Sequence, residues 1–212
     1  MNEFWQWFDD YAEPKLKHRS NTFRKMFVHL DKFKGPVIIE TGCAGGISYE
    51  FWLNQGCSTI LFDRYVSLNG GHFWSVDIDL ERVQNAEKLI GESSQVSCGD
   101  SVEFMKNFSK YDQFPSPHLV YLDAGGFEQQ VPTESQVHHF NELKAIMPKL
   151  TTNTLVVVDD SPLNKKTFVI GGRGGLVSKY ADELAVPLMF TEYQSGWQGF
   201  PGFRTWCPIT DF

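Results

Sequence analysis

Five short apolar runs recur along this chain, and each of them ends in an acidic residue. The runs cover residues 37–40, 72–77, 95–100, 118–123 and 154–160. Because they are continuously apolar rather than alternating, we expect strands that are buried on both faces, as in a mainly parallel sheet covered by helices. The amphipathic segments between them predict helices at 47–55, 58–69, 79–91, 101–110 and 134–149. The pattern predicts an α/β fold.

The segment 58–69 is compatible with a strand or a helix. Its apolar residues Leu61, Tyr65 and Leu68 have helical spacing. Ser58 can cap the start and Gly70 can end the segment, so we interpret it as a helix.

The N-terminal residues 1–34 carry aromatic and aliphatic side chains at helical spacing, which predicts two helices broken near Pro14. We expect them to form a cap, followed by one domain over residues 35–212. Residues 162–175 are predicted to be a long loop.

Composition excludes several classes of partner. The formal net charge is −7 and no long run of Lys or Arg occurs, which argues against a nucleic-acid-binding surface. The four cysteines are scattered, as expected for free thiols in a reducing cytoplasm. No signal peptide and no apolar stretch of membrane-spanning length is visible. We therefore predict a cytoplasmic protein with no membrane contact, and the sequence leaves a homo-oligomer open.

The acids that end the five runs should gather at one place. Ligands of open parallel sheets bind beyond the carboxyl ends of the strands. The acids are Glu40, Asp77, Asp100, Asp123 and the pair Asp159 and Asp160. So many carboxylates at one edge repel each other, so we expect a cationic group or a donor-rich ligand there.

The turn after the first run contains Gly42, Gly45 and Gly46. A dinucleotide-binding G-x-G-x-x-G fails here, because Ala44 and Ile47 stand where glycines are needed. Glu40 would also repel a phosphate. S-adenosylmethionine meets these constraints better, since it carries an amino group and a sulfonium but no phosphate.

Each part of this donor has a candidate partner. We expect Glu40 to contact the amino group, while Gly42, Ala44 and Gly46 allow a close approach of the backbone. Asp77 is the candidate for the ribose hydroxyls, with Asp63 as the alternative if 58–69 is not a helix. Asp100, beside Ser101, is the candidate for the adenine. The alternative is that the glycines form only a strand-to-helix turn.

The order of the segments IIETGCAGG, SVDID, GDSVEFM, HLVYLDAGG and TLVVVDDSP resembles the class I S-adenosylmethionine-dependent methyltransferases. The segment FDRYVSLNGGHFWSVDID is similar to the macrocin-type and cephalosporin-biosynthesis-related O-methyltransferases. The resemblance covers roughly residues 18–197. It implies a Rossmann-like sheet of seven strands, mostly parallel with one reversed strand, whose last hairpin would be formed by 188–193 and 202–208. It also implies methyl transfer to a hydroxyl of a small molecule such as a sugar, a phenol or a natural-product intermediate.

A metal site is the second expectation for this edge. Asp123, Asp159 and Asp160 follow the fourth and fifth strands, and three converging carboxylates would raise one another's pKa. All-oxygen ligation favours Mg²⁺ or another divalent cation. The resemblance implies a Mg²⁺ that is held by these acids and that holds the acceptor hydroxyls. The alternative is that the aspartates only cap the following turns.

The catalytic base is not evident. Similar enzymes place a lysine or a second acid two or three residues beyond the position of Asp123, where this chain has Gly125 and Gly126. Asp123 and Asp159 are the best remaining candidates. His138 and His139, and equally His18, fit packing or surface roles better.

Arg173 lies within the glycine-rich stretch 171–175, which suits a mobile lid that binds an acidic group of the acceptor. A solvated loop is the alternative.

These observations predict an S-adenosylmethionine-dependent O-methyltransferase assisted by Mg²⁺. The alternatives are a metal-independent enzyme, a non-catalytic donor-binding relative, and a nicotinamide-dependent oxidoreductase.

Overall fold

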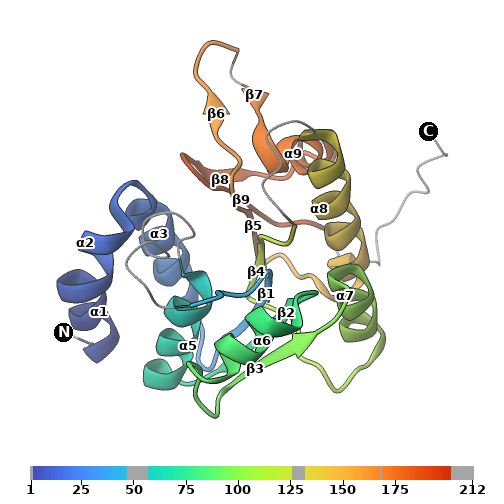
Figure 1. The fold of residues 1–212 in the computed structure, drawn as a ribbon. Coiled ribbons are helices and arrows are strands. Elements are labelled where there is room, and N and C mark those ends of the chain that lie inside the picture. Colours follow the sequence, from blue (N-terminus) through green and yellow to red (C-terminus); the bar gives the residue numbers. More distant parts are fainter. Residues whose placement is uncertain (1, 47–56, 126–131, 168, 202–212) are drawn as a thin grey trace.

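The computed structural model describes residues 2–46, 57–125, 132–167 and 169–201. These residues form a seven-stranded sheet with the strand order β3-β2-β1-β4-β5-β9-β8 (Figure 1). The strands are β1 Val37–Thr41, β2 His72–Asp77, β3 Ser94–Cys98, β4 Leu119–Leu122, β5 Leu155–Val158, β8 Leu188–Thr191 and β9 Ser195–Gln198. The first five pair in parallel, whereas β9 is antiparallel to both β5 and β8. The predicted fold, with its one reversed strand, is confirmed.

The strand register brings the predicted acids to one edge of the sheet. Thr41 at the end of β1 pairs with Val76 of β2 and with Leu122 of β4. Leu122 in turn pairs with Val158 of β5. β1, β4 and β5 are buried along their whole length, as their continuously apolar sequences predict. The carboxylates that follow these strands therefore lie at the same edge.

Helices connect the strands. They are α5 Ser58–Asn69, α6 Leu80–Glu87, α7 Ser101–Lys110, α8 Pro132–Ile146 and α9 Gly175–Glu183. The helix at 58–69 is confirmed, although it starts after Cys57 in a left-handed conformation and without a side-chain cap from Ser58. The predicted helix at 47–55 lies outside the described residues. None of the described helices is long and apolar enough to cross a membrane.

Two apolar cores cover the two faces of the sheet. The N-terminal helices and α5 pack on one face, where Phe4 lies 4.7 Å from Phe27 and 4.8 Å from Tyr65 between ring centroids. α7, α8 and α9 pack on the other face. The N-terminal helices thus share a core with the sheet, and a division of the chain at residue 34 stays a prediction.

The N-terminal helices differ in detail from the prediction. They comprise α1 Glu3–Trp7, a π-helical turn Phe8–Ala12, α2 Glu13–Leu16, a 3₁₀ turn Lys17–Arg19 and α3 Ser20–Leu30. Pro14 does not break the helix, because it lies in the first turn of α2, where a proline is tolerated. The chain turns instead at Lys17, whose φ is +50°. This turn positions Arg19 at the carboxyl edge of the sheet.

One prediction about the C-terminal third is wrong, and a second falls partly outside the described residues. Residues 162–175 are not one loop: they contain β6 Leu163–Asn164 paired with β7 Val169–Ile170, a 3₁₀ turn Gly172–Gly174 and the start of α9. The partner of β8 is β9 at 195–198, and the predicted partner 202–208 lies outside the described residues. β9 can pack here because Gly196 has no side chain: a Cβ on it would lie 2.6 Å from the Phe190 ring.

Candidate active site

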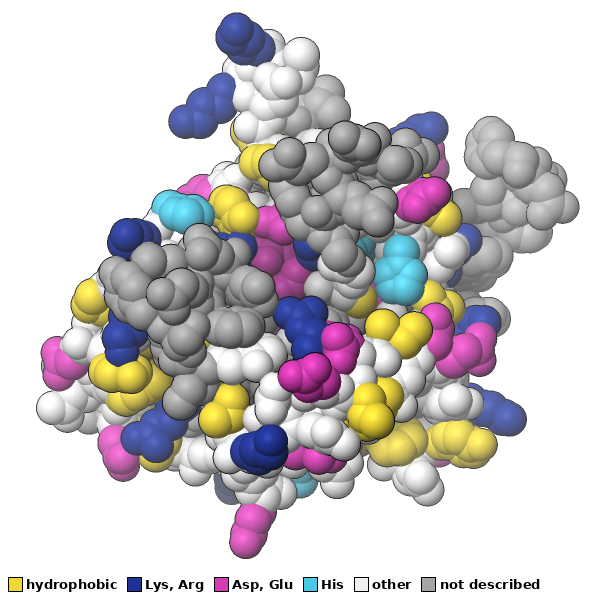
Figure 2. Space-filling model, in the orientation of Figure 1, with side chains coloured by type: hydrophobic (Ala, Val, Ile, Leu, Met, Phe, Trp, Pro, Cys, Tyr) yellow, Lys and Arg dark blue, Asp and Glu magenta, His cyan; other side chains and the backbone are white. Residues whose placement is uncertain are grey.

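Two adjoining cavities open at the carboxyl edge of the sheet. The first has a volume of about 490 Å³ and the second about 310 Å³. Arg82 and Gly125 line both cavities. Figure 2 shows acidic side chains gathered in a hollow in the middle of this face, with basic side chains close by. The predicted edge of the sheet is therefore hollowed and strongly charged.

The glycine turn lies between strand ends at the first cavity. Gly42 has a φ of +84°, and its N–H donates to the Val76 carbonyl at 2.8 Å. A Cβ on Gly42 would lie 2.4 Å from the Asp123 carbonyl oxygen. The next N–H, that of Cys43, donates to Asp77 Oδ2 at 3.0 Å. Gly42 is thus required by its φ and by the close approach of the fourth strand end.

Glu40 lies beneath this turn and is fully buried. Its Oε2 accepts hydrogen bonds from Thr59 Oγ1 at 2.6 Å and from Ser75 Oγ at 2.7 Å. Its Oε1 is buried without a hydrogen-bond partner among the described residues. Burial raises the pKa of Glu40 to about 7. Glu40 lines neither cavity, and its contact with a donor amino group stays a prediction.

The raised pKa of Glu40 predicts a pH-dependent stability. The folded chain holds this proton more tightly than the unfolded chain, so the contribution is present below about pH 4.5 and is lost as the pH rises towards 7. Glu40→Gln mimics the protonated form. In this variant the free energy of unfolding should fall less steeply with pH than in the wild type, by up to about 1.4 kcal/mol per pH unit. Urea unfolding at a series of pH values measures it. Glu87→Gln, at an exposed position, is the control; parallel profiles of Glu40→Gln and the wild type would contradict the assignment.

The second cavity contains the candidates for the ribose and the adenine. Asp77, Asp100, Ser101 and His138 line it. Asp77 is nearly buried, and its Oδ1 accepts the N–H of Asp79 at 2.9 Å. Asp100 also caps α7 by accepting the N–H of Glu103 at 2.9 Å.

Asp63, the alternative ribose partner, lies elsewhere. It is in α5 and lines neither cavity. Its Oδ1 accepts hydrogen bonds from the N–H of Gly91 at 2.8 Å and from Ser94 Oγ at 2.6 Å. The structure thus gives Asp63 a role in holding the start of β3.

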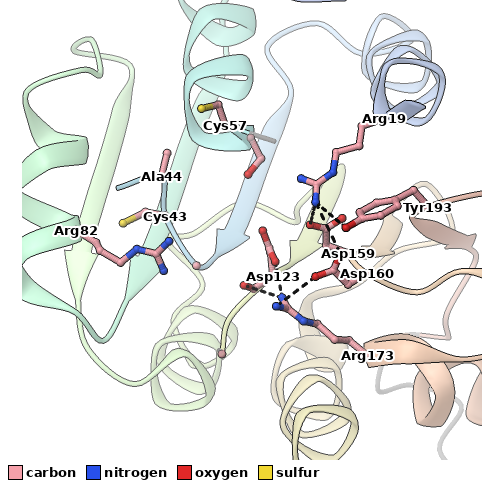
Figure 3. A pocket seen from close by; sticks show the side chains of 13 residues that line it. Arg19, Cys43, Ala44, Cys57, Arg82, Asp123, Asp159, Asp160, Arg173 and Tyr193 are labelled. Atoms are coloured by element: carbon pink, nitrogen blue, oxygen red, sulfur yellow. Dashed lines mark hydrogen bonds and ion pairs between the residues drawn. The ribbon is translucent and has the colours of Figure 1, made fainter. Parts of the chain in front are cut away.

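The three aspartates beyond β4 and β5 come together in the first cavity, where two arginines join them (Figure 3). Arg173 Nη1 donates to Asp123 Oδ1 at 2.6 Å, and its Nη2 lies 3.3 Å from Asp160 Oδ2. Arg19 Nη2 lies 3.7 Å from Asp159 Oδ2 and 3.7 Å from Asp160 Oδ1. The cationic partner that the acids require is therefore supplied by the chain itself.

Burial and charge set the proton affinities in this cluster. Burial and the neighbouring Asp159 raise the pKa of Asp123 well above its ordinary value, although Arg173 opposes the shift. For Arg19, burial disfavours the charged form, but Asp159 together with Tyr121 and Tyr193 outweighs burial and leaves the pKa of the guanidinium above its usual range. Asp123 thus combines a place on the cavity wall with a high affinity for a proton.

Not every candidate reaches a cavity. Gly46 lines neither one, and His139 is fully buried with its Nδ1 2.7 Å from the Ser135 carbonyl. His18 packs against the Tyr193 ring, 4.8 Å between centroids. Arg173 is buried in ion pairs rather than placed on an open lid. Gly126 lies outside the described residues.

Sequence reasoning missed several residues of the site. Arg19 and Arg82 line the first cavity, and Thr59 and Ser75 hold Glu40 in place. Arg82 Nη1 lies 3.6 Å from Asp77 Oδ2. The excess of acidic residues predicted a cationic partner, but nothing in the sequence pattern indicated which arginines would supply the charge.

The fold is shared with solved methyltransferases. MycE from the mycinamycin biosynthetic pathway, solved with Mg and SAH, matches with a TM-score of 0.62 and 15% identity over 98% of this chain and 57% of MycE. The TDP-rhamnose 3′-O-methyltransferase CalS11 matches with a TM-score of 0.55 and 15% identity over 91% of this chain and 86% of its own. An S-adenosylmethionine-dependent methyltransferase from Clostridium acetobutylicum gives a TM-score of 0.51 and 10% identity, over 95% and 98% of the two chains.

These likenesses show the fold. The chain spans about 57% of the length of MycE. No family model matches the sequence, and no curated protein does. The chain has the fold of the S-adenosylmethionine-dependent methyltransferases, as its sequence predicts.

Proposed function

We propose that this chain is an S-adenosylmethionine-dependent methyltransferase that methylates a hydroxyl group of a small molecule. One observation carries the proposal: two adjoining cavities lie at the carboxyl ends of the parallel strands in a methyltransferase fold. The charged walls of the first cavity suit an acceptor rich in hydroxyl groups. MycE in complex with mycinamycin VI and the sugar methyltransferase CalS11 support an acceptor of this kind.

The donor fits the residues that line the second cavity and the glycine turn. Asp77 supplies a nearly buried carboxylate for the ribose hydroxyls, and Asp100 and Ser101 flank the place for the adenine. Gly42 and Ala44 leave the wall of the first cavity without bulky side chains. Glu40 lines neither cavity, but beneath the turn it has one buried carboxylate oxygen without a partner among the described residues, and we assign the amino group to this oxygen.

In the proposed reaction the methyl group passes directly from the donor to the acceptor, and no covalent bond to the protein is formed. When bound, S-adenosylmethionine supplies the methyl group on a sulfonium. The residues of this chain hold the acceptor in line and receive the proton of its hydroxyl. Asp123 is suited to receive it, because it lines the cavity and its pKa is raised by burial and by Asp159. Asp159, buried with one carboxylate oxygen unpartnered among the described residues, is the second candidate.

Magnesium assistance has support and a physical objection. Three aspartates offer the oxygen ligands that Mg²⁺ prefers, and MycE was solved with Mg. The same aspartates are paired with Arg19 and Arg173, and no group of three or more His, Cys, Asp or Glu among the described residues is arranged to hold a metal. As they lie, they do not fit a divalent cation, so the proposed reaction includes no step through one.

A cytoplasmic location stays a prediction.

Removal of the Asp77 carboxylate tests the donor site. Asp77→Ala should weaken binding of S-adenosylhomocysteine by about 1–3 kcal/mol, because a charge-assisted pair of hydrogen bonds is lost. Isothermal titration calorimetry measures the affinity. Asp63→Ala is the matched control, since this aspartate lines neither cavity and should leave the affinity unchanged. Weaker binding in Asp63→Ala, with unchanged binding in Asp77→Ala, would assign the ribose hydroxyls to Asp63 instead.

Two assays separate the alternative functions. Tight binding of NADH and none of S-adenosylhomocysteine would indicate a nicotinamide-dependent oxidoreductase. Binding of S-adenosylhomocysteine with no methyl transfer to a broad panel of sugars and phenols would indicate a donor-binding protein without activity. Transfer of a labelled methyl group to a hydroxyl in the panel is the expected result.

A further inference from the structure

The geometry points to an internal substitute for a metal ion: we propose that Arg19 and Arg173 take the place of a divalent cation among Asp123, Asp159 and Asp160. The site then binds no metal. Its consequence for catalysis, that methyl transfer resists a chelator, rests on the proposed function. The absence of metal binding does not rest on the proposed function, and it can be measured separately.

The charges balance as they would with a metal. When all three aspartates are ionised, three carboxylates and two guanidinium groups leave one net negative charge, which is also what one divalent cation would leave. Arg173 spans the ends of two strands, with Nη1 at Asp123 of β4 and Nη2 at Asp160 beyond β5 (Figure 3). It lies between the oxygens that would have to share an ion.

The chain is built to hold Arg173 in this position. The N–H of Arg173 donates to the Asp160 carbonyl at 3.0 Å. Gly172, with a φ of +55°, approaches that carbonyl so closely that a Cβ would lie 1.9 Å from its oxygen. A Cβ on Gly174 would lie 2.6 Å from the Ser161 Cβ. The glycines on either side of Arg173 thus press this turn against the end of β5.

Arg19 is held from the other side of the cavity. Its side chain is 3% exposed, and Nη2 donates to the Tyr193 hydroxyl at 3.0 Å. The guanidinium carbon lies 4.4 Å from the centre of the Tyr193 ring, within the range of a cation–π contact. Thr22 Oγ1 donates to the Arg19 carbonyl at 2.9 Å, which anchors the backbone. A buried arginine with these partners is a fixed charge.

A metal ion and these arginines exclude each other. Mg²⁺ requires near-octahedral oxygen ligands at about 2.0–2.1 Å. A divalent cation at such distances from the aspartates would lie close to both guanidinium groups, and the repulsion between like charges is large in a buried site. A bound metal would therefore have to displace at least one arginine.

Mn²⁺ is the probe for the wild-type chain, because its electron paramagnetic resonance signal reports the free ion directly. We expect no binding at this site and no shift of the unfolding temperature with Mg²⁺ relative to chelator. Binding of Mn²⁺ that is lost in Asp159→Asn or Asp160→Asn would overturn the proposal, and it requires no arginine variant to fold. Binding that survives both substitutions lies elsewhere and agrees with the proposal.

Removing one guanidinium should create the metal site. In Arg173→Met the three aspartates keep one counter-charge. We expect this variant to bind Mn²⁺ at least roughly tenfold more tightly than any binding detected with the wild type, since one unit charge is removed from close range. Arg173→Lys keeps the charge and should bind none. Arg82→Met is the matched control, because this arginine lines the same cavity but is paired with Asp77. A folded Arg173→Met that also binds no Mn²⁺ would reject the idea that the arginines replace a cation.

Discussion

Alanine at position 42 is expected to lower the free energy of unfolding by about 2–4 kcal/mol, through positive φ and overpacking together. Gly42 has a φ of +84°, where a side chain is strained, and a Cβ would lie 2.4 Å from the Asp123 carbonyl oxygen. Relief of the contact would push the turn away from β4 and change the wall of the first cavity. Chemical denaturation of Gly42→Ala measures the loss, and we expect weaker binding of S-adenosylhomocysteine in the same variant.

Gly70 provides the matched control for this substitution. Its φ is +79°, close to that of Gly42, but a Cβ there would meet no atom of the described residues within 4 Å. With a ψ of 167°, Gly70 lies in a backbone region that is almost confined to glycine, so Gly70→Ala should cost the backbone strain alone, about 1–3 kcal/mol, and leave donor binding unchanged. Equal losses in the two variants would show that the contact between Gly42 and the end of β4 is not tight.

The central sheet could be predicted from the sequence because its signal is local. A strand buried on both faces needs a continuous apolar run, and β1, β4 and β5 are such runs. Asp123 and Asp159 directly follow β4 and β5, Glu40 is the last residue but one of β1, and the parallel pairing puts these strand ends at one edge. The grouping of Asp123, Asp159 and Asp160 follows from that logic alone.

Other elements depend on contacts that the sequence does not display. β9 is a four-residue strand whose Gly196 makes room for Phe190, and a glycine there reads as a turn rather than a strand. α9 begins within a run of glycines, which hides a helix whose Val177, Tyr180 and Ala181 are buried. Tertiary packing overrides local propensity in both cases.

The charge cluster shows the same limit at the site. Crowded carboxylates require a counter-charge, but a metal ion and a pair of arginines satisfy that requirement equally well. Arg173 lies thirteen residues beyond Asp160 and Arg19 comes from the N-terminal helices, so neither is near the aspartates in sequence. Only the turn at Lys17 and the glycines around Arg173 bring them in.

Loss of the Arg19 charge is expected to lower the free energy of unfolding by about 3–5 kcal/mol, the usual cost of leaving a buried ion without its partner. In Arg19→Met, Asp159 remains 1% exposed and loses the guanidinium 3.7 Å away. Tyr193 loses its hydrogen bond and cation–π partner in the same step. Urea unfolding at neutral pH measures the effect.

Lys25 on the neighbouring helix α3 separates burial from charge in this experiment. It pairs with Glu192 at 2.9 Å, but the two side chains are 42% and 38% exposed, so Lys25→Met should cost less than about 1 kcal/mol. Adding Asp159→Asn to Arg19→Met should recover part of the loss, because it removes the uncompensated carboxylate. A loss in Arg19→Met no larger than that of Lys25→Met would mean that the cluster is solvated, and the aspartates would then not need the arginines as a fixed counter-charge.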